Sequence, residues 1–183
     1  MPTKPSNFSR LQQLLPELFE FNKLRGNSYL RSQLTKEINI FLSMDSIQES
    51  LLVAEEQITP IAQMPNYFIG LMSSRDRVFG LIDLAQFLGL NYTTPLSRNY
   101  HKVVVRTSNS ALPEQEQLIG LVFQRVQGVT RVMPEQIQIP QVDLSEKLSV
   151  LNPHIKEYVN ETGQQQPQSF IPILDIDSLV ATL

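Results

Sequence analysis

The stretch MPNYFIGLMSSRDRVFGLIDLAQFLGL, residues 64–90, decides the fold. Two short runs rich in Phe, Ile, Val and Leu flank a polar tip, Ser-Arg-Asp-Arg at residues 74–77, and this pattern predicts an antiparallel hairpin. A brief helix is expected after Asp83, because an Asp before a helix accepts hydrogen bonds from its first free N–H groups. Burial explains the two apolar runs, whereas the two arginines and the aspartate at the tip either form a solvated turn or include a residue with a function.

Similar segments continue on both sides of this hairpin. They are short, rich in Val, Ile and Phe, and separated by polar turns, which predicts a mainly β fold built from small antiparallel barrels. A chain of 183 residues accommodates one domain, or two small barrels that share an interface. The other strand candidates are residues 28–34, 38–44, 101–108, 116–126, 128–134 and 169–176.

Two further helices are expected in the C-terminal part of the chain. The segment 175–183 predicts a short C-terminal helix, with Asp175 or Asp177 as its N-cap. The mixed segment 141–170 contains a possible helix at residues 152–159.

The tripeptide Ile-Gly-Leu occurs twice inside predicted strands, at residues 69–71 and 119–121. A glycine inside a strand marks a bend or a close approach of another backbone. The echo is compatible with two barrels of related construction.

Residues 1–27 predict an amphipathic helical extension that precedes the β-rich body. Leu and Phe recur there at three- and four-residue steps, and Gly26 is a plausible stop. Pro16 starts the main helix or kinks a longer one. The apolar face either packs on the body or binds a partner, and we expect packing.

The composition excludes several classes of protein. A net charge of -3 argues against a general nucleic-acid binder, which needs a strongly positive surface. Cysteine is absent and the only histidines are His101 and His154, so a structural zinc site is not expected. No long apolar run is present, and we expect a cytoplasmic protein without membrane insertion.

The sequence also offers little for catalysis. It contains no phosphate-binding glycine loop, dinucleotide fingerprint or nucleophile motif. His101 and His154 are interpreted as ordinary, partly exposed histidines, and Asp83 as a helix cap. We therefore expect no enzyme, no cofactor and no metal, although a weak active site built on His101 and Asp83 remains an alternative.

Residues 58–90 resemble the central signature of CheW, the coupling protein of bacterial chemosensory arrays. In that family a Pro precedes a Gly-containing strand, an Asn-Leu-Arg-Gly turn follows, and the next strand ends in an apolar-Asp-Leu triplet before a short helix. Pro65, Gly70, Arg75, residues 82–84 and Phe87 match these positions. Ile47 and Glu49 match an earlier Val-x-Glu step, and the resemblance extends over residues 28–183.

The chain departs from the family pattern in three places. Asp76 replaces the turn glycine, and Asp is among the few residues that tolerate positive φ. Gln124 stands where the family usually has an Asp, and the N-terminal extension is additional. These departures are typical of a divergent paralogue, and such paralogues serve systems that control type IV pili, including surface motility and phototaxis.

The resemblance implies two five-stranded, SH3-like barrels packed side by side, and an adaptor without chemistry of its own. One barrel would bind the regulatory domain of a CheA-type histidine kinase, and the groove between the barrels would bind the cytoplasmic tip of a receptor helical bundle. Such an adaptor would be recruited to receptor arrays at the membrane.

The resemblance assigns partner binding to Arg75, Ile47, Glu49 and Asp76, with Arg75 presenting its cation to a receptor helix and Arg77 left as solvated surface. A small barrel that binds peptides without any kinase remains the alternative function.

Overall fold

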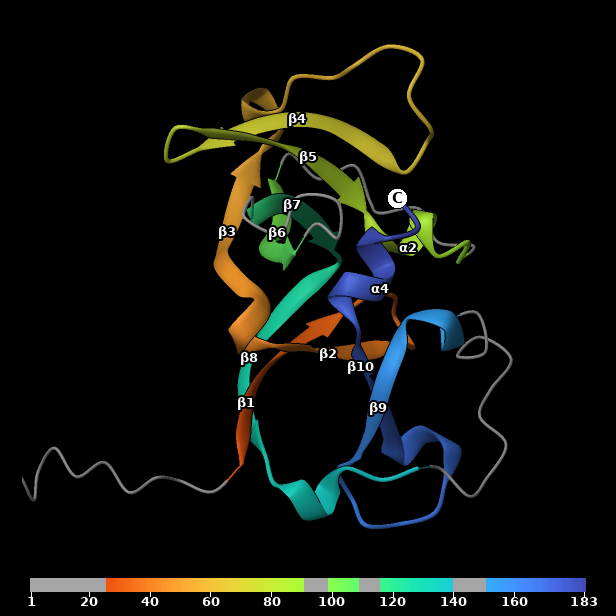
Figure 1. Cartoon of the computed structure of the whole chain (residues 1–183). Helices are drawn as coiled ribbons and strands as arrows, with labels where there is room; N and C mark the ends of the chain where they lie inside the picture. Colours follow the sequence, from red (N-terminus) through yellow and green to blue (C-terminus); the bar gives the residue numbers. More distant parts are fainter. Residues whose placement is uncertain (1–25, 91–98, 109–115, 140–150) are drawn as a thin grey trace, which may run out of the picture.

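The computed structural model describes residues 26–90, 99–108, 116–139 and 151–183. The expected N-terminal helix lies outside these ranges, and so does the polar loop that the sequence predicts at residues 109–114. The described residues form two five-stranded sheets, as Figure 1 shows. One sheet has the order β8 (Arg125–Val132), β1 (Asn27–Gln33), β2 (Asn39–Ser43), β10 (Phe170–Leu174), β9 (Ile155–Asn160), and the other β3 (Ile47–Ala54), β6 (Asn99–Ser108), β7 (Glu116–Phe123), β5 (Arg77–Asp83), β4 (Phe68–Ser74).

Each sheet closes on itself through one short bridge between its two edges. In the sheet that contains β1, Ile137 follows β8 and pairs with Val159 of β9. In the sheet that contains β3, Thr59 lies beyond the end of β3 and pairs with Leu71 of β4. The two sheets are therefore two small barrels, called here the first barrel (β1, β2, β8, β9, β10) and the second barrel (β3–β7), which confirms the predicted fold class.

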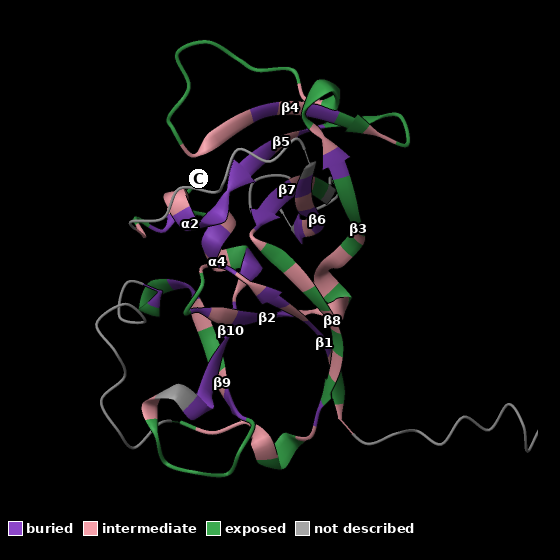
Figure 2. Cartoon of the chain, turned by 180° about the vertical axis from the view of Figure 1, so that it is seen from behind, coloured by how far each residue is buried: buried purple, intermediate pink, exposed green. Residues whose placement is uncertain are grey.

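Alternation along the strands divides the apolar side chains of the described residues among four clusters, one in the first barrel, one between the barrels and two in the second barrel. The buried colour in Figure 2 includes the strands where the barrels meet. Ile40 and Leu42 of β2 share one core with Val103 and Val105 of β6, so this core lies between the barrels. Phe41 points the other way, into the first barrel. A strand turns successive side chains to opposite faces, so one strand can serve two cores.

The second barrel is inserted into the chain of the first. The chain builds β1 and β2, crosses to build β3–β7, and returns for β8, β9 and β10 (Figure 1). Two short helices, α2 (Leu84–Phe87) and α4 (Ile176–Val180), lie near this junction and contribute Leu84, Ile176 and Leu179 to the shared core.

Two of the proposed helix caps are confirmed. Asp83 Oδ1 accepts from the backbone N–H of Gln86 at 3.1 Å, and Asp175 Oδ1 accepts from that of Ser178 at 3.1 Å. Asp177, the alternative cap for the last helix, instead accepts from the Thr107 hydroxyl at 2.9 Å.

Other sequence-based predictions are wrong. Residues 152–159 do not form a helix, because a 3-10 turn at Asn152–His154 leads directly into β9. His154 is buried, with 9 % of its surface exposed, rather than partly exposed. The two Ile-Gly-Leu segments lie in β4 and β7 of the same barrel, so the echo does not relate one barrel to the other.

Candidate functional site

The charged tip is a two-residue loop that joins β4 to β5. Ser74 pairs with Arg77, which leaves Arg75 and Asp76 as the loop, with φ values of 47° and 64°. Positive φ at both central positions is the pattern of a type I′ turn, which favours Asn-Gly or Asp-Gly. The sequence anticipated Asp76 in this conformation, but an arginine with positive φ is a strained residue, and such strain clusters at functional sites.

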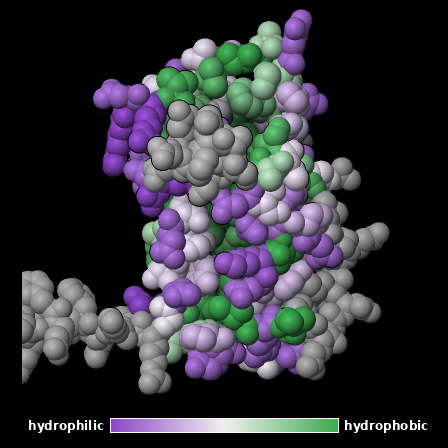
Figure 3. Space-filling view, in the orientation of Figure 1, coloured by the Kyte–Doolittle hydropathy of each residue, from purple (hydrophilic) through white to green (hydrophobic). Residues whose placement is uncertain are grey.

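The hairpin tip forms one side of an open groove, and the first half of β3 forms the other. We call it the seam groove, because it lies where the edges of the second barrel are not bridged. Its cavity volume is about 310 Å³. Figure 3 has the orientation of Figure 1, and it shows hydrophilic residues at the position that the tip of the β4–β5 hairpin occupies there. The lining residues are Gln48, Glu49, Ser74, Arg75, Arg77, Phe79, Val104 and Leu118.

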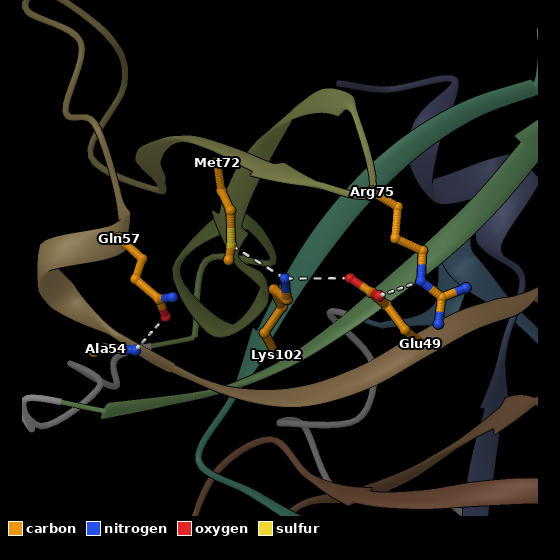
Figure 4. Close-up of polar contacts among 6 residues, drawn as sticks. All are labelled: Glu49, Ala54, Gln57, Met72, Arg75 and Lys102. Atoms are coloured by element: carbon orange, nitrogen blue, oxygen red, sulfur yellow. Dashed lines mark hydrogen bonds and ion pairs between the residues drawn. The ribbon is translucent and has the colours of Figure 1, made fainter.

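Glu49 and Arg75 meet across this groove, as Figure 4 shows. The Glu49 Oε2 atom lies 3.9 Å from Arg75 Nε, and the side chains are 10 % and 75 % exposed, respectively. An ion pair this open to water contributes less than about 1 kcal/mol. The contact therefore orients the two groups without removing Arg75 from solvent.

A lysine that the sequence analysis did not single out lies on the other side of Glu49. Lys102 Nζ is 3.5 Å from Glu49 Oε1 and donates to Met72 Sδ at 3.1 Å, with the Phe79 ring centroid at 5.1 Å (Figure 4). The Lys102 side chain is fully buried. Burial lowers the pKa of Lys102, and the Glu49 carboxylate opposes that shift.

The other two proposed binding residues are not brought to the groove lining. Ile47 is partly buried and packs against the core between the barrels. A register shift between Ile47 and Glu49 breaks the regular alternation of β3. The two side chains, which would otherwise share a face of the strand, therefore lie in different environments. Asp76 is exposed at the tip of the hairpin and is absent from the groove lining. The structure thus unites Arg75 with Glu49, and it places Arg77, expected as solvated surface, at the groove edge.

A signal for Lys102 was present in the sequence. It stands two residues before Val104 on β6, and residues two apart on a strand share a face. Val104 packs inside the second barrel, so Lys102 points there too. The lysine was not identified as a site residue, because lysine is rarely buried unless it is paired.

Neither a metal-binding cluster nor a membrane-spanning helix is found in the part of the chain that the structure describes. Within the described residues, no group of three or more His, Asp or Glu side chains is placed to hold a metal ion. The same part of the chain contains no helix that is long and apolar enough to cross a membrane.

Comparisons with known proteins agree with this architecture. Residues 29–183 match the model of the CheW-like domain family, and the chain belongs to that family. The chemotaxis protein CheW of Thermotoga maritima is 24 % identical over 139 residues, which cover 76 % of this chain and 80 % of that protein. The crystal structure of the scaffolding protein TtCheW from Thermoanaerobacter tengcongensis superposes with a TM-score of 0.63 at 16 % identity, over 84 % of this chain and 92 % of that one.

Proposed function

We propose that this protein is a non-enzymatic adaptor of a chemosensory pathway, which couples a methyl-accepting-type receptor to a CheA-type histidine kinase. Membership of the CheW-like domain family over residues 29–183 supports the adaptor role. The observation that carries the proposal is the seam groove, where the two-residue turn holds the Arg75 guanidinium, 75 % exposed, beside Glu49.

The chemistry of the groove suits protein binding rather than catalysis. A guanidinium presents a planar set of donors that matches a carboxylate or backbone carbonyls on a partner. A two-residue loop has little freedom, so little conformational entropy is lost when Arg75 is bound. Arg75 and Glu49 are thus the centre of the proposed receptor contact, with Asp76 supporting the turn and Ile47 supporting β3 from the core.

The finer assignments follow the resemblance of the sequence to the family. One barrel binds the regulatory domain of the kinase, and the receptor tip binds in the groove between the barrels. We extend the receptor contact to the seam groove of the second barrel, where Arg75 lies. Holding both partners at once raises their effective concentration without any new contact between them. The replacement of the turn glycine by Asp76 and the presence of Gln124 support a divergent paralogue. We assign it to a pathway that controls motility, by chemotaxis, twitching or phototaxis, and such paralogues favour the two surface outputs.

Calorimetry with the purified regulatory domain of the cognate kinase tests the adaptor role. We expect binding in the micromolar range, about -8 kcal/mol, as is common for small signalling interfaces. Absence of heat at high micromolar concentrations rejects the proposal. A gene deletion that abolishes surface motility but not swimming supports the finer assignment, and the reverse result rejects it.

A further inference from the structure

Lys102 is a buried cation inside the second barrel, and it lies behind Glu49, which lines the seam groove. Its side chain is fully buried inside the second barrel, against the Met72 sulphur and the Phe79 ring. A buried ammonium is strongly unfavourable unless an anion pairs with it. Glu49 supplies that anion at 3.5 Å. A hydrophobic side chain in this place would have filled the barrel without any need for a counter-ion.

The Glu49 carboxylate is therefore shared unequally between two cations. Oε1 faces Lys102 at 3.5 Å in a buried environment, and Oε2 faces Arg75 at 3.9 Å at a surface that is largely open to water. Charge attraction strengthens as distance shortens and as water is excluded, so Lys102 is the stronger partner. Glu49 is held inward at 10 % exposure, and the Arg75 guanidinium is compensated only weakly.

We infer that Lys102 is a positioning residue, which holds the Glu49 carboxylate inward so that the Arg75 guanidinium is available to a carboxylate of the partner. This inference rests on the proposed function, because it assigns the chemistry of the receptor contact. Without Lys102, Glu49 turns toward Arg75 and neutralises it. A neutralised tip then has no preference for an acidic partner segment, because the forked donors of Arg75 are already occupied.

The Lys102→Met variant separates this role from a packing role. Methionine is similar in length to lysine and apolar, so it fills the same space, and the Glu49 carboxylate that loses its buried partner can still pair with Arg75 at the open groove. The variant is therefore expected to fold. The double variant with Glu49→Gln removes both the lysine and the charge that would neutralise Arg75, so it restores the free guanidinium if the inference is right.

The first test needs no partner. Phenylglyoxal modifies arginines through their neutral form, so a carboxylate that pairs with Arg75 slows its modification. Mass spectrometry of digested protein follows Arg75, with the exposed Arg125 as internal reference. We expect Lys102→Met to slow the reaction of Arg75 by about two- to fivefold, the range of exposed ion pairs, and the double variant to recover it. An unchanged rate in Lys102→Met, or no recovery, overturns the inference.

The second test measures binding to a soluble fragment that contains the cytoplasmic tip of the cognate receptor. We expect Lys102→Met to weaken binding by about two- to fivefold, because Glu49 then occupies the donors of Arg75. The control is Lys36→Met, which removes the same charge from an exposed turn. Thermal melts confirm that all the variants are folded, so that a loss of affinity is not a loss of structure.

The outcomes separate the inference from the proposed function. If the unaltered protein binds neither the receptor fragment nor the kinase domain, the adaptor role fails, and the phenylglyoxal rates alone decide the role of Lys102. If the unaltered protein binds the receptor fragment and Lys102→Met binds equally well, the adaptor role stands and the inference about Lys102 is wrong.

Discussion

Thr59 and Leu71 exchange two backbone hydrogen bonds of 2.8 Å each, and among the described residues this is the β-bridge that joins the two edges of the second barrel. Gly70 makes the approach possible. A Cβ atom added to Gly70 would lie 2.5 Å from the Thr59 carbonyl oxygen. Such a contact forces the backbone apart, so the bridge depends on the absence of a side chain at this position.

We therefore expect Gly70→Ala to lower the free energy of unfolding by about 1–3 kcal/mol, as overpacking does elsewhere. Urea denaturation measures the loss. Gly128→Ala is the matched control, because its φ of +137° is similar to the +157° of Gly70 but nothing lies within 4 Å of an added Cβ. Equal losses in both variants would mean that backbone conformation, and not the Thr59 contact, sets the cost.

Arg75→Glu reverses the charge at the tip beside Glu49. We expect receptor binding to weaken by about tenfold or more, because an interface arginine often dominates affinity. An exposed turn residue buries little, so folding should lose less than about 0.5 kcal/mol. Titration with the receptor fragment and a thermal melt give both values, with Arg125→Glu on the first barrel as control. Unchanged receptor affinity would return Arg75 to the class of solvated surface residues.

Replacement of Arg75-Asp76 by Asn-Gly relieves the backbone strain that positive φ imposes at both positions. We expect the free energy of unfolding to rise by about 1 kcal/mol, since Asn-Gly is the preferred type I′ pair. Receptor affinity should fall, because the guanidinium is gone. Chemical denaturation and calorimetry on the same variant test the two effects. A variant that is no more stable would show that the native turn stores no strain.

The lowered pKa of Lys102 gives a pH dependence with a definite sign. Burial places the folded-state pKa below the usual 10.5. Between these two values the unfolded chain binds more protons, so the contribution of Lys102 to stability rises with pH. The pKa of Tyr100 and that of Tyr158 are raised by burial and act in the opposite direction above about pH 10, but both residues remain in the Lys102→Met variant.

The stability of the wild type relative to Lys102→Met should therefore increase from about pH 7 to about pH 10. Urea denaturation of both proteins over this range measures the difference at each pH. A constant difference would place the folded pKa of Lys102 at its ordinary value.

The N-terminal extension leads to a prediction from sequence alone. If the apolar face of residues 1–25 packs on the barrels, each buried Leu or Phe contributes about 1.5–3 kcal/mol, and a chain of residues 26–183 should melt much lower. Differential scanning calorimetry of both chains measures this. An equal melting temperature, together with the loss of one partner, would assign the face to docking instead.

Several strands were predictable from the sequence because runs of apolar, β-branched residues indicate buried strands. β6 contains consecutive valines, of which Val103 and Val105 face one core and Val104 another. β3 was missed because its middle residues, Ser50, Leu51 and Leu52, are all exposed, so no alternation identifies it. β9 was interpreted as a helix because Ile155, Tyr158 and Val159 fall at helical spacing in a segment where only tertiary pairing with β10 selects the strand.

The candidate site was also predictable only in part. Arg75 and Glu49 were proposed through the resemblance to the family, and the structure brings them together. The role of Asp76 as a residue with positive φ followed from turn chemistry. Lys102 was not predicted, because its burial depends on barrel closure, which joins residues 30 or more positions apart.

The core shared by the barrels has a mechanical consequence. Leu30, Ile40 and Leu42 of the first barrel interlock with Val103, Val105 and Leu121 of the second. Tilting one barrel against the other would expose this shared core to water, so the structure resists bending between the barrels. Partners bound to the two barrels are therefore held at a fixed angle to each other, and a displacement of one barrel moves the other with it.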